Sequence, residues 1–386
     1  MKKEYIVGVD FGYDVTSAWI ISLFDDNLYG ESLKLKNSNK ESERSYDSII
    51  YYNPKYGYSL DVLSGNIIAG FKDKVSVLDQ PQNAKKREAY TEYIKQIYAR
   101  LLKYNTVLKV DKNGDANFYL CIAFPSKWNQ EDKDAYIKFF NNVLCEFGIE
   151  VMLGINESDA INNSFLPHRS NKNSLLINYN AGYIEYIVRN NERKKYIKVS
   201  SLGSDLVVEI LLDECRKDIN FQETLEYTSK LSQLDQDIIM SYVKRKIRKG
   251  VEYSVTFGYY PNLEVNCNLV VELTNYWSTD TCYAEKRKYK FEIDCQIDKY
   301  IGSYKEKLEN ELNMLIEETG IDCDNKIDNV IITGHDSYMP WMCEVVKKVF
   351  NTSTIHIDQS GCFAIARGIA LFAKQQIKAY KILIHI

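Results

Sequence analysis

The stretch Ile6-Val7-Gly8-Val9-Asp10-Phe11-Gly12-Tyr13 decides how the rest of this 386-residue chain is interpreted. Its apolar half predicts a buried strand, Asp10 stands at the end of that strand, and Gly12 predicts a tight turn. The apolar run 17–24 then predicts the return strand. The stretch is therefore typical of a β-hairpin that carries a carboxylate beside its turn.

A second unit of the same kind begins about half a chain later. Leu175-Leu176-Ile177-Asn178-Tyr179-Asn180-Ala181-Gly182-Tyr183 again joins an apolar strand, a polar residue at its end and a turn that contains glycine. Residues 184–189 and 195–200 predict two more strands. Two copies of one hairpin unit favour two related lobes that face each other across a cleft. The alternative is a pair of ordinary hairpins that bind nothing.

Strands and helices alternate along the rest of the chain, which predicts an α/β fold. Asn129 is expected to cap one helix, and the helix over 84–104 is expected to bury one face. The buried side chains of these two helices are predicted to be Tyr90, Ile94, Ile97, Leu101, Phe139, Phe140, Val143 and Phe147. Further helices are predicted over 204–218, 233–249, 296–319, 340–350 and 361–375, and further strands over 48–52, 118–124, 151–155, 251–257, 263–273, 289–293, 329–332 and 354–357.

The composition disfavours several classes of protein. Lys+Arg 49 against Asp+Glu 53 leaves a net charge of −4, so we expect no nucleic-acid partner. No apolar stretch is long enough to span a membrane, and no signal peptide is recognised, so we expect a cytoplasmic protein without membrane association. The nine cysteines lack C-x-x-C spacing and the four histidines do not cluster. We therefore expect reduced, mostly buried thiols and no zinc site.

Glycine scarcity bears directly on nucleotide binding. The chain has 18 Gly and 30 Tyr, whereas the usual frequency would give roughly 27 Gly. Glycine lets a backbone approach phosphate oxygens closely, so a glycine-poor chain is an awkward candidate. Asp10 and Gly12 still form one possible set for phosphate and Mg²⁺, and Asn178, Gly182 and Glu185 form a weaker second set.

A third element is the apolar strand 330–332, followed by Gly334 and a helix with Pro340 near its first turn; such a corner can pack against a nucleoside. In this order the three elements resemble the phosphate-1, phosphate-2 and adenosine motifs of the actin-like ATPase superfamily. The resemblance is strongest to the nucleotide-binding domain of the 70 kDa heat-shock chaperones, the DnaK type. Four further segments resemble that family in order and at its spacing: 122–129, 155–160, 201–205 and 364–370.

The resemblance implies a duplicated, ribonuclease H-like two-lobe fold that binds ATP or ADP with Mg²⁺. It implies a first lobe over 1–173 with an inserted subdomain at about 30–115, and a second lobe over 174–386 with one at about 215–300. The implied catalytic positions are Asp10, which would organise Mg²⁺ through water, Glu157, Asn178 and Glu185. The implied nucleotide-binding positions are Gly12, Tyr13, Asp14, Gly182, Tyr183, Gly203, Asp205, Arg248, Lys249, Gly334, His335 and Tyr338.

Several of these positions depart from the motifs of the family. Asn178 replaces an aspartate, and Asn180 and Ala181 replace two glycines. No convincing equivalent of the cleft lysine of the family is recognised near 60–75, where Lys72 and Lys74 are the candidates. Each active-site departure would lower the rate by roughly 10²–10³-fold, so several together would leave little hydrolysis. The other departures are Tyr13, Asp14, Tyr183, His335 and Tyr338.

The favoured hypothesis is a chaperone-like or scaffold protein that binds nucleotide weakly or not at all and works through protein partners. One alternative is an active Mg-ATP hydrolase, and another is an actin-like filament subunit. A sugar or acetate kinase of the same superfamily is a lesser alternative. We expect no covalently attached peptide-binding domain, and we expect residues 380–386 to form an interdomain linker or a terminal edge strand.

Overall fold

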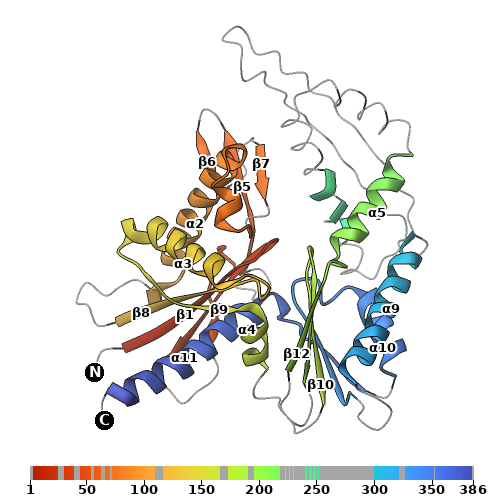
Figure 1. Cartoon of the computed structure of the whole chain (residues 1–386). Coiled ribbons are helices and arrows are strands. Elements are labelled where there is room, and N and C mark those ends of the chain that lie inside the picture. The colour runs from red at the N-terminus through yellow and green to blue at the C-terminus, as the bar shows by residue number, and fades with distance from the viewer. Residues whose placement is uncertain are drawn as a thin grey trace.

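The computed structural model contains two mixed sheets surrounded by helices (Figure 1), which establishes a mixed α/β protein. It describes residues 3–384 with gaps at 25–29, 39–43, 54–55, 62–65, 70–71, 109–115, 166–172, 190–194, 252–299, 321–326 and 352. Between 218 and 251 the described residues are 222, 226, 229, 240, 243–245, 247, 248, 250 and 251.

The first sheet is built around the opening stretch of the sequence. β1 (Lys3–Phe11) pairs antiparallel with β2 (Val15–Ser22) and parallel with β8 (Ala116–Phe124). β8 in turn pairs parallel with β9 (Val151–Asn156). The second half of β1 is buried throughout because this central strand is covered on both faces. Two short strands also pair with β2, namely β3 (Glu31–Ser32) and β4 (Tyr46–Asp47).

The second sheet has the same strand order. β10 (Ser174–Tyr179) pairs antiparallel with β11 (Ile184–Arg189) and parallel with β13 (Asn329–Thr333). β12 (Lys195–Ser200) pairs antiparallel with β11, and β14 (Thr354–Ile357) pairs parallel with β13. In both sheets the central strand lies between its hairpin partner and a parallel crossover strand. The strands predicted from the apolar runs are confirmed in both sheets.

Helices cover the outer faces of the two sheets (Figure 1). α2 (Ala84–Tyr104) and α3 (Gln130–Leu144) share a hydrophobic core with the first sheet. α5 (Asp205–Cys215), α9 (Gly302–Thr319) and α10 (Pro340–Val349) share another core with the second sheet. The side chains predicted to face the first core and found buried are Tyr90, Ile94, Ile97, Leu101, Phe139, Phe140 and Val143.

α4 (Glu157–Ser164) and α11 (Ala364–Ile384) form the layer between the sheets, where a third core joins residues of both. α11 packs against α4, β1 and β2 at very short range. A Cβ added at Gly368 would lie 1.7 Å from the carbonyl oxygen of Ala160, so only glycine allows this approach. The last helix of the chain is thereby held against the first sheet.

The structure contains a small antiparallel sheet that was not predicted from the sequence. β5 (Ile49–Asn53) is its central strand, between β6 (Gly57–Ser59) and β7 (Asn66–Ala69). The sequence predicted one strand here, over 48–52. The short helix α1 (Val75–Leu78) follows, and the segment between β7 and α1 carries a lysine that reaches the site described below.

Two predictions about helix ends are wrong. Asn129 caps α3 as predicted, accepting a hydrogen bond from a backbone N–H, but α3 ends at Leu144. Gly148 then adopts a left-handed conformation, and Phe147 is exposed instead of buried. The predicted linker or edge strand at 380–386 is helical as far as Ile384, because no Gly or Pro interrupts the sequence after Gly368.

Other predictions fall on parts of the chain that are only partly described. The predicted strands 251–257, 263–273 and 289–293 and most of the helix 233–249 lie outside the described residues. The five described cysteines are free thiols, of which Cys121 and Cys215 are buried, fewer than expected. Among the described helices, none combines the length and the apolar character that crossing a membrane requires.

Candidate functional site

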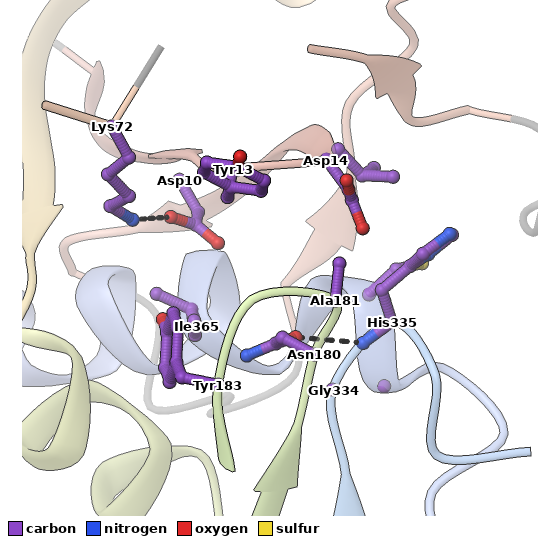
Figure 2. Close-up of a pocket in the computed structure, with 14 residues that line it drawn as sticks. Asp10, Tyr13, Asp14, Lys72, Asn180, Ala181, Tyr183, Gly334, His335 and Ile365 are labelled. Carbon is purple, nitrogen blue, oxygen red and sulfur yellow. Dashed lines mark hydrogen bonds and ion pairs between the residues drawn. The ribbon is translucent and has the colours of Figure 1, made fainter. Parts of the chain in front are cut away.

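A pocket lies where the two hairpin turns meet (Figure 2). The turn between β1 and β2 lines one side, and the turn between β10 and β11 lines the other. The empty volume is about 460 Å³, including solvent at the mouth. The lining residues are Asp10, Gly12, Tyr13, Asp14, Val15, Lys72, Asn180, Ala181, Tyr183, Gly334, His335, Gly361, Cys362 and Ile365.

Lys72 joins two carboxylates beside the first turn, and Figure 2 shows its ion pair with one of them, Asp10. Its Nζ lies 2.8 Å from Asp10 Oδ1 and also contacts Glu157 Oε1. Tyr183, from the second turn, donates a hydrogen bond from its hydroxyl to Glu157 Oε2. Burial acts to lower the pKa of Lys72, but the two carboxylates outweigh it and raise that pKa. The ammonium group therefore stays charged inside a closed ion cluster, which we call the Lys72 cluster (Lys72, Asp10 and Glu157).

Asn178 and Glu185 face each other across β10 and β11, and both are buried. Neither lines the pocket. Within the described part of the chain, neither the nitrogen nor the oxygen of the Asn178 side-chain amide has a hydrogen-bond partner. The four predicted catalytic positions thus form two groups. Asp10 and Glu157 meet at Lys72, whereas the other two lie behind the second turn.

Backbone donors next to the second turn are already hydrogen-bonded within the protein. At the beginning of α5, the N–H groups of Ser204 and Asp205 donate to the carbonyl oxygens of Asn180 and Ala181, at 3.1 and 2.9 Å. The N–H of His335 donates to the side-chain oxygen of Asn180 at 3.2 Å. The first N–H groups of a helix usually have no partner and can bind anions. Here two of them hold the turn instead.

Arg248 connects the two sides of the pocket. Its guanidinium lies 3.1 Å from Asp14 of the first turn and 3.3 Å from Asp336, which follows β13. It also contacts Asp205 and donates to the Ser204 hydroxyl at 3.2 Å. Burial acts to lower the pKa of Arg248, but the three carboxylates raise it. We call this group, Arg248 with Asp14, Asp205 and Asp336, the Arg248 cluster.

Burial governs the two carboxylates of the first turn. It raises the pKa of Asp10, an effect that Lys72 opposes and Glu157 reinforces. It also raises the pKa of Asp14 to about 6, although the nearby guanidinium of Arg248 acts to lower it. Each carboxylate therefore depends on a cation that comes from a distant part of the chain.

Two glycines that line the pocket, Gly12 and Gly334, are explained by contacts within the protein. A Cβ on Gly12 would lie 2.4 Å from the carbonyl oxygen of Val15, and one on Gly334 would lie 2.4 Å from that of Tyr179. Gly334 also has a φ of +99°, which favours glycine. Gly182 has room, since the nearest atom, in an aromatic ring, would be 3.9 Å from its Cβ. Gly12 and Gly334 are thus no evidence of a bound phosphate here.

Among the described residues, five predicted nucleotide contacts do not line the pocket: Gly182, Gly203, Asp205, Arg248 and Tyr338. Tyr338 is exposed and packs edge-to-face with His335, with 6.4 Å between ring centroids. Gly203 packs under the second turn, since its Cβ would lie 2.1 Å from the carbonyl oxygen of Ala181. Lys249 lies outside the described residues.

Two residues central to the site were not assigned from the sequence. Lys72 was one of two candidate lysines, and Lys74 instead pairs with Asp132. Asp336 was given no role, although it is fully buried and binds Arg248. Asp336 comes shortly after β13 and Gly334. A polar residue where a strand ends is also the pattern that indicated Asp10. The same pattern could therefore have identified Asp336 from the sequence.

The donor atoms of the cluster do not fit a resident Mg²⁺ ion. Asp10 Oδ1 and Glu157 Oε1 are bound by Lys72, and Glu157 Oε2 is bound by Tyr183. Within the described ranges, no three His, Cys, Asp or Glu side chains are grouped so that they could hold a metal ion. No known family profile matches the sequence, and no curated protein matches it. The function must therefore be argued from the site.

Proposed function

We propose that this chain is a scaffold or chaperone-like protein with the two-lobed fold of the DnaK-type ATPases, which binds nucleotide weakly or not at all and acts through protein partners. The fold supports the proposal, because both sheets share one strand order with the same strand directions. Such a repeat agrees with a duplicated, ribonuclease H-like origin. The pocket between the two hairpin turns is where the ligand of such a fold would bind.

The observation that carries the proposal is that the groups to which a phosphate would bind are already bound by other residues of the same chain. The cations that line or border the pocket, Lys72 and Arg248, are both bound by carboxylates of the same chain. The N–H groups of Ser204 and Asp205 are bound by the second turn. Phosphate recognition relies on such cations and N–H groups. A nucleotide would have to displace these contacts, and breaking one buried ion pair costs about 3–5 kcal/mol.

Side chains also extend into the space where a phosphate loop would be bare. Tyr13 lies over the pocket next to Asp10, and Tyr183 projects into it beside Ile365 (Figure 2). Ala181 adds a methyl group at the second turn. These side chains narrow the approach to the turn backbones, which supports weak or absent nucleotide binding.

A second candidate, an active hydrolase, is favoured by one specific observation. Lys72 lies between Asp10 and Glu157 in the pocket, and a charged triad of this kind can position water and stabilise negative charge. Its side chains would need to separate before a phosphate could enter. Turnover measurements therefore decide between the two candidates.

Calorimetric titration of the chain with ATP and ADP, with and without Mg²⁺, tests the proposal. We expect no saturable heat below about 1 mM nucleotide, which corresponds to a binding free energy weaker than about −4 kcal/mol. A dissociation constant in the micromolar range would overturn the proposal. Phosphate release from ATP is measured in parallel, with Asp10→Ala as the control. Turnover that Asp10→Ala abolishes would establish the hydrolase, whereas equal release in both samples marks a contaminant.

A further inference from the structure

The two carboxylates of the Lys72 cluster close around a single cation, the Lys72 ammonium. Two carboxylate oxygens, Asp10 Oδ1 and Glu157 Oε1, converge on one point, which the ammonium nitrogen occupies. All three side chains are almost fully buried, with exposures of 3%, 8% and 1% for Lys72, Asp10 and Glu157. Calcium–oxygen distances are about 2.3–2.6 Å and magnesium–oxygen distances about 2.0–2.1 Å. The Asp10 carboxylate lies 2.8 Å from the ammonium nitrogen and Glu157 also contacts it, so both need to move little to close on a metal ion.

Charge explains why a cation is required at this point. Without Lys72, two buried carboxylates would face each other with no opposite charge, and burying unpaired charges is very costly. The nearest polar side chain of the second turn, Tyr183, donates a hydrogen bond to Glu157 but carries no positive charge. One ammonium leaves this pair of carboxylates with a net charge of −1, whereas a divalent ion would leave it neutral.

We propose that Lys72 is a built-in cation that takes the place of a divalent metal ion, and that its removal uncovers a metal site formed by Asp10 and Glu157. In the wild-type chain the ammonium excludes Mg²⁺, Ca²⁺ and Mn²⁺ from the cluster. In Lys72→Ala the same two carboxylates bind one of these ions, with water completing the coordination. The proposal goes beyond the proposed function, because it holds whether or not nucleotide binds.

Thermal unfolding with metal salts alone tests this proposal. Wild type, Lys72→Ala and the double variant Lys72→Ala/Glu157→Gln are each measured in 10 mM MgCl₂, CaCl₂ or MnCl₂, at matched ionic strength. We expect no metal-dependent shift in the wild type. We expect Lys72→Ala to unfold at a lower temperature and to regain about 2–4 °C in at least one of the salts, saturably. The double variant, which has lost one carboxylate, should show no such recovery.

Two results would overturn the proposal, and neither depends on nucleotide. One is saturable stabilisation of the wild type by a divalent ion that disappears in Glu157→Gln, because the cluster would then already hold a metal beside Lys72. The other is a folded Lys72→Ala that none of the three ions stabilises. Should Lys72→Ala be unfolded without metal, refolding into each salt gives the answer. Recovery of the fold in one salt supports the proposal, and no recovery in any of them overturns it.

Discussion

The two hairpin turns beside the pocket share one backbone plan but differ in chemistry. The first turn carries Asp10 and Asp14, and each carboxylate is bound by a cation from a distant segment, Lys72 or Arg248. The second turn is neutral, from Asn178 to Tyr183, and neighbouring backbone N–H groups hold it. One turn is thus contacted by side-chain cations and the other by backbone N–H groups.

The comparison of the two turns indicates that the fold needs the strand–turn–strand unit but not an acidic side chain at the end of the strand. β10 forms with Asn178 where β1 has Asp10, and the pairing of each strand with its neighbours is the same. The charges of the first turn therefore serve contacts across the pocket. Removing those contacts should affect the first turn more than the second.

The largest expected effect comes from Arg248→Met. This change leaves the fully buried Asp336 and the partly buried Asp14 without their cation. Breaking a buried ion pair in this way costs about 3–5 kcal/mol, so urea unfolding should show a loss of that size in the free energy of unfolding. Arg245→Met is the matched control, because the Arg245–Asp47 pair is more exposed and should cost less than about 1 kcal/mol. Equal losses in the two variants would show that the burial of the Arg248 pairs does not raise the cost of breaking them.

The next effect compares one glycine from each turn. In Gly12→Ala the new Cβ would lie 2.4 Å from a backbone carbonyl oxygen, so the first turn must shift, and overpacking of this kind costs about 1–3 kcal/mol. In Gly182→Ala the new Cβ meets only a ring atom at 3.9 Å. Its stability should stay within about 0.5 kcal/mol of wild type. The same urea experiment measures both, and a loss in Gly182→Ala as large as that in Gly12→Ala would show that the second turn is equally constrained.

The longer strands of both sheets could be predicted because their apolar runs are bounded by polar turns, whereas the two-residue strands β3 and β4 were not predicted. The small sheet of β5, β6 and β7 could not be predicted, since its strands have only three to five residues each and follow one another through polar segments. The C-terminal tail was misread for a different reason. A short apolar run such as 382–386 fits a strand or a helix equally well, and only the helix that precedes it decides.

The site was predictable where one residue marks the end of one strand, as Asp10 does. It was not predictable where distant segments meet. Lys72 and Lys74 lie two positions apart in a polar segment, and only the folded chain shows that one enters the pocket and the other pairs with Asp132. Arg248 reaches Asp336 across 88 positions of sequence, a pairing that no local pattern contains.

The smallest of these effects concerns the pH dependence that Asp14 gives the first turn. Burial raises its pKa from 3.8 to about 6 in the folded protein. A carboxyl with a raised pKa contributes stability that is fully present below pH 3.8 and is lost as the pH rises through about 6. Asp14→Asn removes this loss of stability. Its free energy of unfolding should therefore exceed that of wild type by an amount that grows between pH 4 and pH 7. Because 24% of the Asp14 side chain is exposed and solvent screens its charge, we expect the free energy of unfolding of Asp14→Asn to exceed that of wild type by only about 1–2 kcal/mol at pH 7.

The pH-dependent gain of Asp14→Asn is measured by urea unfolding of both proteins at pH 4, 5, 6 and 7. Asp205→Asn is the matched control, since Asp205 also binds Arg248 but its side chain is 42% exposed. It should lose a partly exposed ion pair, at a cost below about 1 kcal/mol. If Asp14→Asn is instead less stable than wild type at pH 7, attraction to Arg248 outweighs burial. The Asp14 charge would then stabilise the first turn at pH 7, which would contradict the expected gain.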